Sequence, residues 1–407
     1  SDSGSYIIEY DAINKIVSFV LKDTRTPNIL DLNEAYLVTG IVLIIDTDND
    51  NRFLCYTDNN KQPRFINIER AKGYGENGFD EEAILLIKKP PLDAPVLSLS
   101  STKTFTENNI EEKFLLFAYR YKYLDEEYSA LSPISEVAFK PKSFSFDFST
   151  STNESMINSF NIVGIEMNTG GKLITDVELI FKESLHNNLY LVEKYNKKEK
   201  GWEDNENVTV DFYNNKIYKT LSENQLFRSF DGVPLKAKAL DSINSILVFG
   251  NYTENWNLIE GSNAPINLNL ELEVVSTDVT SQNSYASNKT NRDYEVGIVY
   301  GETYGRHTTV LTSENNTAHV PSISCAKKNE LKLFVKSKPP KFADLFRICI
   351  KQNRYDYDII VPSLFYEDGN FVWIKLETAD IDKIKVSDYI HIKSDTGGIL
   401  TTIKQVK

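Results

Sequence analysis

The spacing Gly73-x-Gly75-x-x-Gly78 matches the glycine-rich loop that binds the pyrophosphate of dinucleotides. That loop works only between a strand and a helix of a β-α-β unit, where the N-terminus of the helix faces the phosphates. Here the second strand of such a unit would fall on residues 90–95, which contain three prolines and cannot lie in a parallel sheet. We therefore interpret the three glycines as a flexible loop and predict no bound cofactor.

Three carboxylates, Asp46, Asp48 and Asp50, have the spacing of the first ligands in a calcium-binding loop. The sixth position of that loop is Asn51 instead of glycine, and the twelfth is Thr57 instead of a bidentate glutamate. These three aspartates are the candidate metal ligands of the chain. A solvated acidic turn at the tip of a hairpin is the interpretation that we favour.

The sequence lacks the motifs of known catalytic centres, such as HExxH or GxSxG. Acidic pairs such as Glu203–Asp204 lie in polar turns, without the apolar walls that raise the pKa of a catalytic carboxylic acid. Tryptophans could stack on sugars, but in a β protein they belong more often to the core. We predict that the chain is not an enzyme. The residues considered are His186, His307, His319 and His391, and Trp202, Trp256 and Trp373.

Composition narrows the class of protein. The 407 residues suffice for two or three domains, and 22 Tyr and 22 Phe against 2 Met favour the pleated surfaces of strands. The formal net charge of −13 comes without the clustered basic face that sequence-specific nucleic-acid binding needs. Such an acidic surface suits a conduit that lets DNA pass, and it also suits a protein that only needs to stay soluble.

Other features of the sequence argue against a membrane or a disulfide framework. No apolar run is long enough to span a membrane, and no signal peptide pattern opens the chain. The three cysteines, Cys55, Cys325 and Cys349, have no metal-ligand spacing, and we expect them to be reduced and packed. Because the chain starts at Ser1 and stops directly after a strand-like run, we expect a piece of a longer polypeptide.

The clearest element is a hairpin between Phe114 and Phe139. From Leu115 to Leu124, every second residue is aromatic or leucine, and the residues between them include Arg120 and Lys122. This period of two predicts a half-buried antiparallel strand. Residues 125–127 form an acidic turn, and a return strand is expected from Tyr128 toward Phe139. Pro133 cannot donate to a strand ladder, so this return is expected at an edge or a bulge.

Further elements follow along the chain. A hairpin is expected from Tyr36 to Tyr56, and a short helix within Asp80–Lys89. The capping-box pattern at Ser222 predicts a helix that ends before Gly232. Strands include Tyr355–Pro362, and Ser276–Asn291 is expected to be a long surface loop. The segment Tyr294–Leu311 repeats the order of the first hairpin, which suggests two sandwich-like units.

Several phrases resemble a known family. The strand ending in Tyr-x-Tyr, its acidic turn and the Tyr-Ser-Ala-x-Ser-Pro return resemble a late hairpin of fibronectin type III-like sandwiches. With four other segments, they resemble the tail muzzle, or nozzle, proteins of crAss-like bacteriophages, which are related to the nozzles of short-tailed phages. The five segments are Thr57–Ile68, Ile84–Pro95, Tyr119–Pro133, Leu221–Tyr252 and Tyr294–Leu311.

This resemblance implies a mainly β, propeller-like nozzle fold with inserted fibronectin type III-like β-sandwich material and a few short helices. It divides the chain into propeller-like blades (1–91), an inserted sandwich (92–220), a return helix and propeller strand (221–262) and a second sandwich-like region (263–407).

The implied function is structural. Copies would form a ring, a hexamer in the family, that meets ring, hub and portal components in the virion tail and surrounds the distal channel for genome exit. Viral DNA would pass without sequence-specific binding. We expect some carboxylates to face the lumen, with residues 46–50 and 125–127 as candidates.

Two other classes of protein stay open. A bacterial surface or secreted β-sandwich adhesin that binds carbohydrate would show an aromatic-lined groove. A glycan-cleaving β-propeller would need two carboxylates facing a pocket at the separation that glycoside hydrolysis requires.

Overall fold

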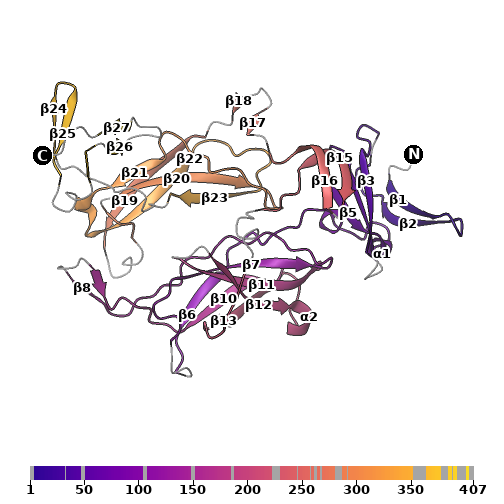
Figure 1. Ribbon diagram of the computed structural model, residues 1–407, viewed down its shortest axis with the longest axis horizontal. Coiled ribbons are helices and arrows are strands. Elements are labelled where there is room, and N and C mark those ends of the chain that lie inside the picture. Colours follow the sequence, from indigo (N-terminus) through magenta and orange to yellow (C-terminus); the bar gives the residue numbers. More distant parts are fainter. Residues whose placement is uncertain are drawn as a thin grey trace. The chain divides into compact units, whose positions relative to one another are not determined.

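The computed structural model describes most of the chain, and its order of elements is shown in Figure 1. The described residues are 4–32, 34–46, 51–103, 108–147, 152–184, 188–221, 230–244, 246–256, 258–260, 264–265, 268–279, 287–290, 292–351, 364–376, 384–386, 388–391 and 400–402. Two compact units are present. The first comprises Ser1–Trp256 together with Glu302–Arg306, and the second comprises Asn257–Gly301 and His307–Lys407.

The first unit begins with small antiparallel sheets and the short helix α1, which share hydrophobic clusters. A two-stranded ribbon is followed by a three-stranded sheet in the order β3-β4-β5, and a second ribbon comes much later in the sequence. The elements are β1 (Ser5–Asp11), β2 (Ile16–Asp23), β3 (Gly40–Asp46), β4 (Asn51–Thr57), β5 (Arg64–Asn67), α1 (Ile68–Lys72), the 3-10 helix η1 (Glu81–Ile84), β15 (Lys236–Ile243) and β16 (Ile246–Thr253).

The β3-β4-β5 sheet is apolar on both faces, which is why it can lie between other elements. On one face Tyr56 and Ile66 pack with α1 and with Leu21 of β2. On the other face Cys55 packs with Leu240 of β15. The Thr57 hydroxyl also donates to the Ala237 carbonyl over 2.7 Å. We call this arrangement of β1–β2, β3-β4-β5 and β15–β16 the three-sheet stack.

The rest of the first unit is a β-sandwich. One sheet has the order β13-β10-β6 and the other the order β14-β12-β11-β7. The elements are β6 (Val96–Ser100), β7 (Leu115–Tyr123), β10 (Ile162–Asn168), β11 (Ile174–Glu183), β12 (Leu189–Asn196), α2 (Lys197–Lys200), β13 (Asn207–Phe212) and β14 (Lys219–Thr220), with the short pair β8 (Ser145–Asp147) and β9 (Thr152–Glu154) beside them in sequence.

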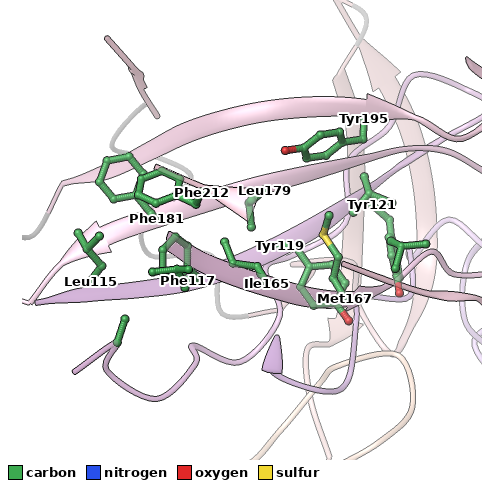
Figure 2. Close-up of a cluster of buried hydrophobic side chains, with 14 of the residues drawn as sticks. Leu115, Phe117, Tyr119, Tyr121, Ile165, Met167, Leu179, Phe181, Tyr195 and Phe212 are labelled. Carbon is green, nitrogen blue, oxygen red and sulfur yellow. The ribbon is translucent and has the colours of Figure 1, made fainter. Parts of the chain in front are cut away.

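Aromatic side chains from both sheets fill this sandwich (Figure 2). The rings of Phe117 and Phe181 each lie 5.2 Å from that of Phe212. The structure corrects one expectation, because both faces of β7 are buried. Arg120 lies on the face opposite the aromatic residues and pairs with the buried Glu178, its Nε donating over 2.8 Å.

The second unit is built from further antiparallel pairs around a smaller core of Leu270, Ile298 and Tyr300. Its described strands form the pair β19–β22, the sheet β21-β20-β23 and three separate hairpins. The elements are β17 (Ile259–Glu260), β18 (Ala264–Pro265), β19 (Leu270–Asp278), β20 (Arg292–Gly301), β21 (Thr317–Val320), the 3-10 helix η2 (Ser322–Ser324), β22 (Lys327–Val335), β23 (Leu345–Ile350), β24 (Phe365–Asp368), β25 (Phe371–Ile374), β26 (Tyr389–His391) and β27 (Leu400–Thr402).

The mainly β class is therefore confirmed, and no sheet closes on itself within the described ranges. The helix expected within Asp80–Lys89 is only the 3-10 turn η1. The reason is that its later amides bond elsewhere: Leu86 donates to the Pro63 carbonyl and Lys88 to the Asp231 carboxylate. The helix expected after Ser222 and the strand Tyr355–Pro362 lie outside the described residues. The four-segment division of the chain stays a prediction.

Candidate functional site

The predicted acidic metal site is described at one position only. Asp46 ends β3 and is partly exposed, whereas Asp48 and Asp50 lie outside the described residues. Elsewhere in the described part of the chain, no three His, Cys, Asp or Glu side chains come close enough to hold a metal ion.

The glycine-rich segment follows a helix instead of preceding one. Gly73 caps the C-terminus of α1, and Gly75 takes a left-handed φ of 67°. A dinucleotide loop needs the opposite order, with the helix N-terminus after the glycines. The loop is also anchored, which corrects the expectation that it is flexible: Asn77 donates its backbone N–H to the Lys22 carbonyl and accepts from the Thr24 N–H through Oδ1.

The tryptophans and histidines do not converge on one site. Trp202 packs on the Tyr195 ring, 5.6 Å away, and Trp256 Nε1 donates to Glu302 Oε2 over 2.9 Å. Trp373 lies on β25 and is 37% exposed. The His319 ring contacts the Asp293 carboxylate at 2.7 Å on the surface, and the Nδ1 of His307 lies 3.0 Å from the Thr308 carbonyl. His186 and the side chain of His391 are outside the description.

The segment that returns from the β7 turn is not the regular strand that the sequence predicted. Three serines spaced three residues apart face every second residue of β7. The serine N–H donates to the carbonyl of its β7 partner, and the serine hydroxyl accepts from the N–H of the same partner. The pairs are Ser129 with Tyr121, Ser132 with Tyr119 and Ser135 with Phe117, with donor–acceptor distances of 2.8 to 3.0 Å.

We call Ser129, Ser132 and Ser135 the serine ladder. Each hydroxyl also donates to the carbonyl of the residue that follows the serine. Pro133 falls between two rungs, where β7 requires no N–H from it. The pattern Ser-x-x-Ser-x-x-Ser is the sequence signal that could have identified this pairing. A regular strand advances two residues for every two residues of its partner, whereas this segment advances three. A search for a period of two therefore does not detect the pairing.

A second hairpin repeats the first at its turn. Tyr300 N–H donates to the Thr308 hydroxyl and Thr308 N–H to the Tyr300 carbonyl, as Tyr121 does with Ser129. The two hairpins thus share the turn and the rung next to it, and the suggestion of two sandwich-like units stays a prediction. At the next rung the residue is Leu311, which has no hydroxyl. It pairs with Ile298 through the backbone alone, the N–H of each residue donating to the carbonyl of the other.

The acidic turn of the first hairpin holds structural ion pairs. Asp125 Oδ2 accepts from Arg70 Nη1 over 2.9 Å, and its Oδ1 accepts from Asn67 Nδ2 over 3.2 Å. Its side chain is only 11% exposed because Arg70 and Asn67 enclose it, so this candidate for a lumen-facing carboxylate is largely buried in the single chain. Glu126 is 79% exposed, although it pairs with Lys122.

Glu127, the last residue of that turn, contacts Lys88 Nζ at 2.8 Å. Burial raises the pKa of the Glu127 carboxyl, Asp125 and Asp231 act in the same direction, and Lys88 opposes them. Lys88 Nζ also donates to the Leu85 carbonyl over 3.1 Å. The Lys88 side chain is 8% exposed and that of Glu127 is 32% exposed, so the pair lies at the edge of the buried part of the unit.

The tip of the second hairpin, Glu302–Arg306, belongs to the first unit and is buried there. The Arg306 side chain is fully buried. Its Nη1 donates to Glu302 Oε1 over 2.6 Å and to Gln62 Oε1 over 3.0 Å, and its Nη2 donates to the carbonyls of Val233 and Pro234 over 3.0 Å. Every side-chain nitrogen of the guanidinium thus has a partner, which is what a buried arginine requires.

Apolar side chains cover the outer face of the β1–β2 ribbon. Ile8 lies opposite Phe19, and Tyr10 lies opposite Val17, so that all four side chains point to one side. Each is 57 to 60% exposed, whereas Leu21 on the other face is buried in the stack.

The opposite end of the three-sheet stack shows a similar face. Ile243 lies opposite Ile246 on the outer side of β15–β16, and Val248 lies two residues further along β16. These three side chains are 57, 66 and 43% exposed. The exposed Asp241 lies opposite Val248 on this face, so the face is mixed and not purely apolar. Exposed apolar side chains that gather on one face are a feature of interaction sites.

Comparison with known proteins adds no identification, since no family model matches the chain and no curated protein is found to be similar. None of the helices in the described ranges is long and apolar enough to cross a membrane.

Proposed function

We propose that the chain is a structural subunit of a bacteriophage tail nozzle, which assembles into a ring around the distal channel for genome exit. The observation that carries this proposal is the apolar outer surface of small sheets whose inner faces are already packed. A sheet that is apolar on both faces and covered on one is incomplete in the single chain. The residues that the structure describes do not supply its second cover, and we infer that another chain does.

The stack itself supports the propeller-like part of the proposal. The β15–β16 ribbon lies against β3-β4-β5, and β2 joins the other side of that sheet through a core shared with α1. Small antiparallel sheets are layered in a similar way in the blades of a propeller. An inserted sandwich between β5 and β15 matches the order that the nozzle resemblance implies. The net charge of −13 fits a wall along which a polyanion passes without adhering.

Electron microscopy of the purified chain, and of the native particle from which it comes, tests this function. We expect a closed ring whose lumen admits duplex DNA and whose lining carries net negative charge. A chain that stays monomeric, or a ring with a basic lumen, would contradict the proposal.

One observation favours the alternative of a carbohydrate-binding adhesin. On the β24–β25 hairpin, Tyr366 lies opposite Trp373, and both rings are partly or largely exposed on one face. Exposed aromatic rings of this kind stack on sugar faces. Binding to a glycan array that is lost in Trp373→Ala, together with a monomeric chain, would establish the adhesin instead.

A further inference from the structure

We propose that a cavity at the start of β7 binds a ring-sized apolar group that carries a positive charge. The cavity lies in the first unit and has a volume of about 150 Å³. Its lining comes from three segments: the turn that precedes β7, the end of the return segment after the serine ladder, and the residues that follow β9. Such binding does not depend on assembly into a ring.

Hydrogen bonds from one buried asparagine hold these three segments together. Asn158 Nδ2 donates to the carbonyls of Ile110 and Lys113 over 3.0 and 2.9 Å. The Asn158 N–H donates to the Glu111 carbonyl over 2.8 Å, and its Oδ1 accepts from the Lys140 N–H over 3.4 Å. The walls of the cavity are therefore fixed in the absence of a ligand, as is usual for binding sites of small molecules.

The apolar part of the lining fits one aromatic ring. Phe114 and Phe139 lie with their ring centroids 5.5 Å apart and their planes tilted by 48°. Met156 and Ile157 complete the apolar lining. A cavity of this volume with such a lining accommodates a group of the size of benzene. Aromatic faces and the methionine sulfur also make favourable contacts with a further ring.

The polar part of the lining favours a positive charge. Glu111 and Glu112 belong to it, and the lining residues that the structure describes include no basic side chain. Lys142, which is not part of the lining, pairs with Glu111. Glu112 is exposed and makes no ion pair within the described ranges, so its carboxylate is available to a ligand. A cation between a carboxylate and aromatic rings is attracted by both.

The two methionines of the chain give a direct readout of binding. Met156 lines the cavity, whereas Met167 is 2% exposed in the core of the sandwich and serves as an internal control. In protein with isotope-labelled methionine methyl groups, benzylammonium should shift the Met156 signal until it saturates and leave the Met167 signal in place. The variant Met156→Leu assigns the two signals.

A series of probes tests charge and ring separately. Benzyl alcohol and phenylacetate keep the ring but lose or invert the charge, and methylammonium keeps the charge without the ring. Each should bind at least about tenfold more weakly than benzylammonium. A capped phenylalanyl-lysine dipeptide distinguishes two sources of the same chemistry. If only the dipeptide binds, the ligand is a protein segment, and if only benzylammonium binds, it is a small amine.

Variants of the lining locate the site. Glu112→Gln should weaken the binding of benzylammonium about tenfold and leave that of benzyl alcohol unchanged, because only the ammonium pairs with the carboxylate. Glu136→Gln is the matched control, since Glu136 is an exposed carboxylate of the return segment outside the lining. Met156→Trp fills the cavity and should abolish calorimetrically measured binding. Circular dichroism and the melting temperature check that each variant is folded.

Three results would overturn the proposal. If neither benzylammonium nor the dipeptide moves the Met156 signal of the wild type up to about 10 mM, the cavity binds no such group. Equal affinity for benzylammonium and benzyl alcohol would show that Glu112 does not select a cation. Binding that persists in a folded Met156→Trp variant would place the site elsewhere on the chain.

Discussion

Arg306 and Glu127 occupy the same position in two hairpin tips. The carbonyl of Glu127 accepts from the N–H of Tyr123 over 2.8 Å, and that of Arg306 accepts from the N–H of Glu302 over 3.0 Å. The residue before each has a positive φ, 63° at Glu126 and 89° at Gly305. One backbone turn thus presents an acidic side chain in one hairpin and a basic side chain in the other, and both are held by partners in the first unit.

Arg306→Ala should strongly destabilise the first unit. The substitution removes the donor that Arg306 supplies to Glu302 Oε1 and to the Val233 and Pro234 carbonyls, while Trp256 Nε1 still donates to Glu302 Oε2. We expect the free energy of unfolding to fall by about 3 to 5 kcal/mol. Urea denaturation followed by tryptophan fluorescence measures it.

Lys216→Ala is the control for that experiment. Lys216 pairs with Glu193 at 3.3 Å, but both side chains lie largely in solvent. Its loss should change the free energy of unfolding by less than about 1 kcal/mol. Equal effects of the two substitutions would show that Arg306 contributes no more than a surface charge.

The serine ladder predicts which residues can replace Ser129. In Ser129→Ala the N–H of Tyr121 loses its acceptor in a buried strand, which should cost about 1 to 3 kcal/mol of unfolding free energy. Ser129→Thr should stay close to the wild type, because Thr308 takes this place in the second hairpin. Thermal and urea unfolding of the two variants test the ladder, and a threonine variant as unstable as the alanine variant would contradict it.

Glu127 should make stability depend on pH. Its pKa is raised in the folded protein above the ordinary value near 4.5, so the folded state holds the proton more tightly than the unfolded state does. The free energy of unfolding contributed by this group therefore decreases as pH rises from that value through the raised pKa, and is regained on acidification.

Glu127→Gln removes this dependence. Urea unfolding of both proteins from about pH 4 to 8 should show the wild type losing stability relative to the variant as pH rises, and then a constant difference. A wild type that gains stability relative to the variant over this range would show that Lys88 lowers the pKa of Glu127 more than burial raises it.

Cys55 should resist thiol reagents in the folded protein. Burial raises the pKa of its thiol to about 12, and the side chain is 1% exposed. Cys325 is exposed. Because the thiolate is the reactive form, maleimide at mildly alkaline pH should label Cys325 first and Cys55 only after unfolding. Peptide mapping by mass spectrometry identifies the labelled residues, and rapid labelling of Cys55 without denaturant would contradict its burial.

The sequence predicted local patterns well and long-range pairing poorly. The strand from Leu115 was predicted from its period of two, and the structure places β7 there. The burial of Arg120 could not be predicted, because its partner Glu178 lies far away in sequence and only the pairing of β7 with β11 brings them together. The enclosure of Asp125 could not be predicted either, since its partner Arg70 comes from α1.

The candidate surfaces were hidden from sequence reasoning in another way. Tyr10 and Val17 read as ordinary core-facing strand residues, because periodicity shows that a face is apolar but not which chain covers it. Only the packed inner face of the ribbon, with Leu21 in the core, shows that the outer face has no cover from the described part of the same chain.

The serine ladder also limits how the length of this segment can change. From one rung to the next, the return segment advances three residues and β7 advances two. A serine therefore meets β7 only when it lies three residues from the previous serine. An insertion or deletion of one residue between Ser129 and Ser135 would turn the following hydroxyls away from β7. Evolution should therefore tolerate changes in the length of this hairpin mainly when they add or remove one whole rung, that is, three residues of the return segment together with two of β7.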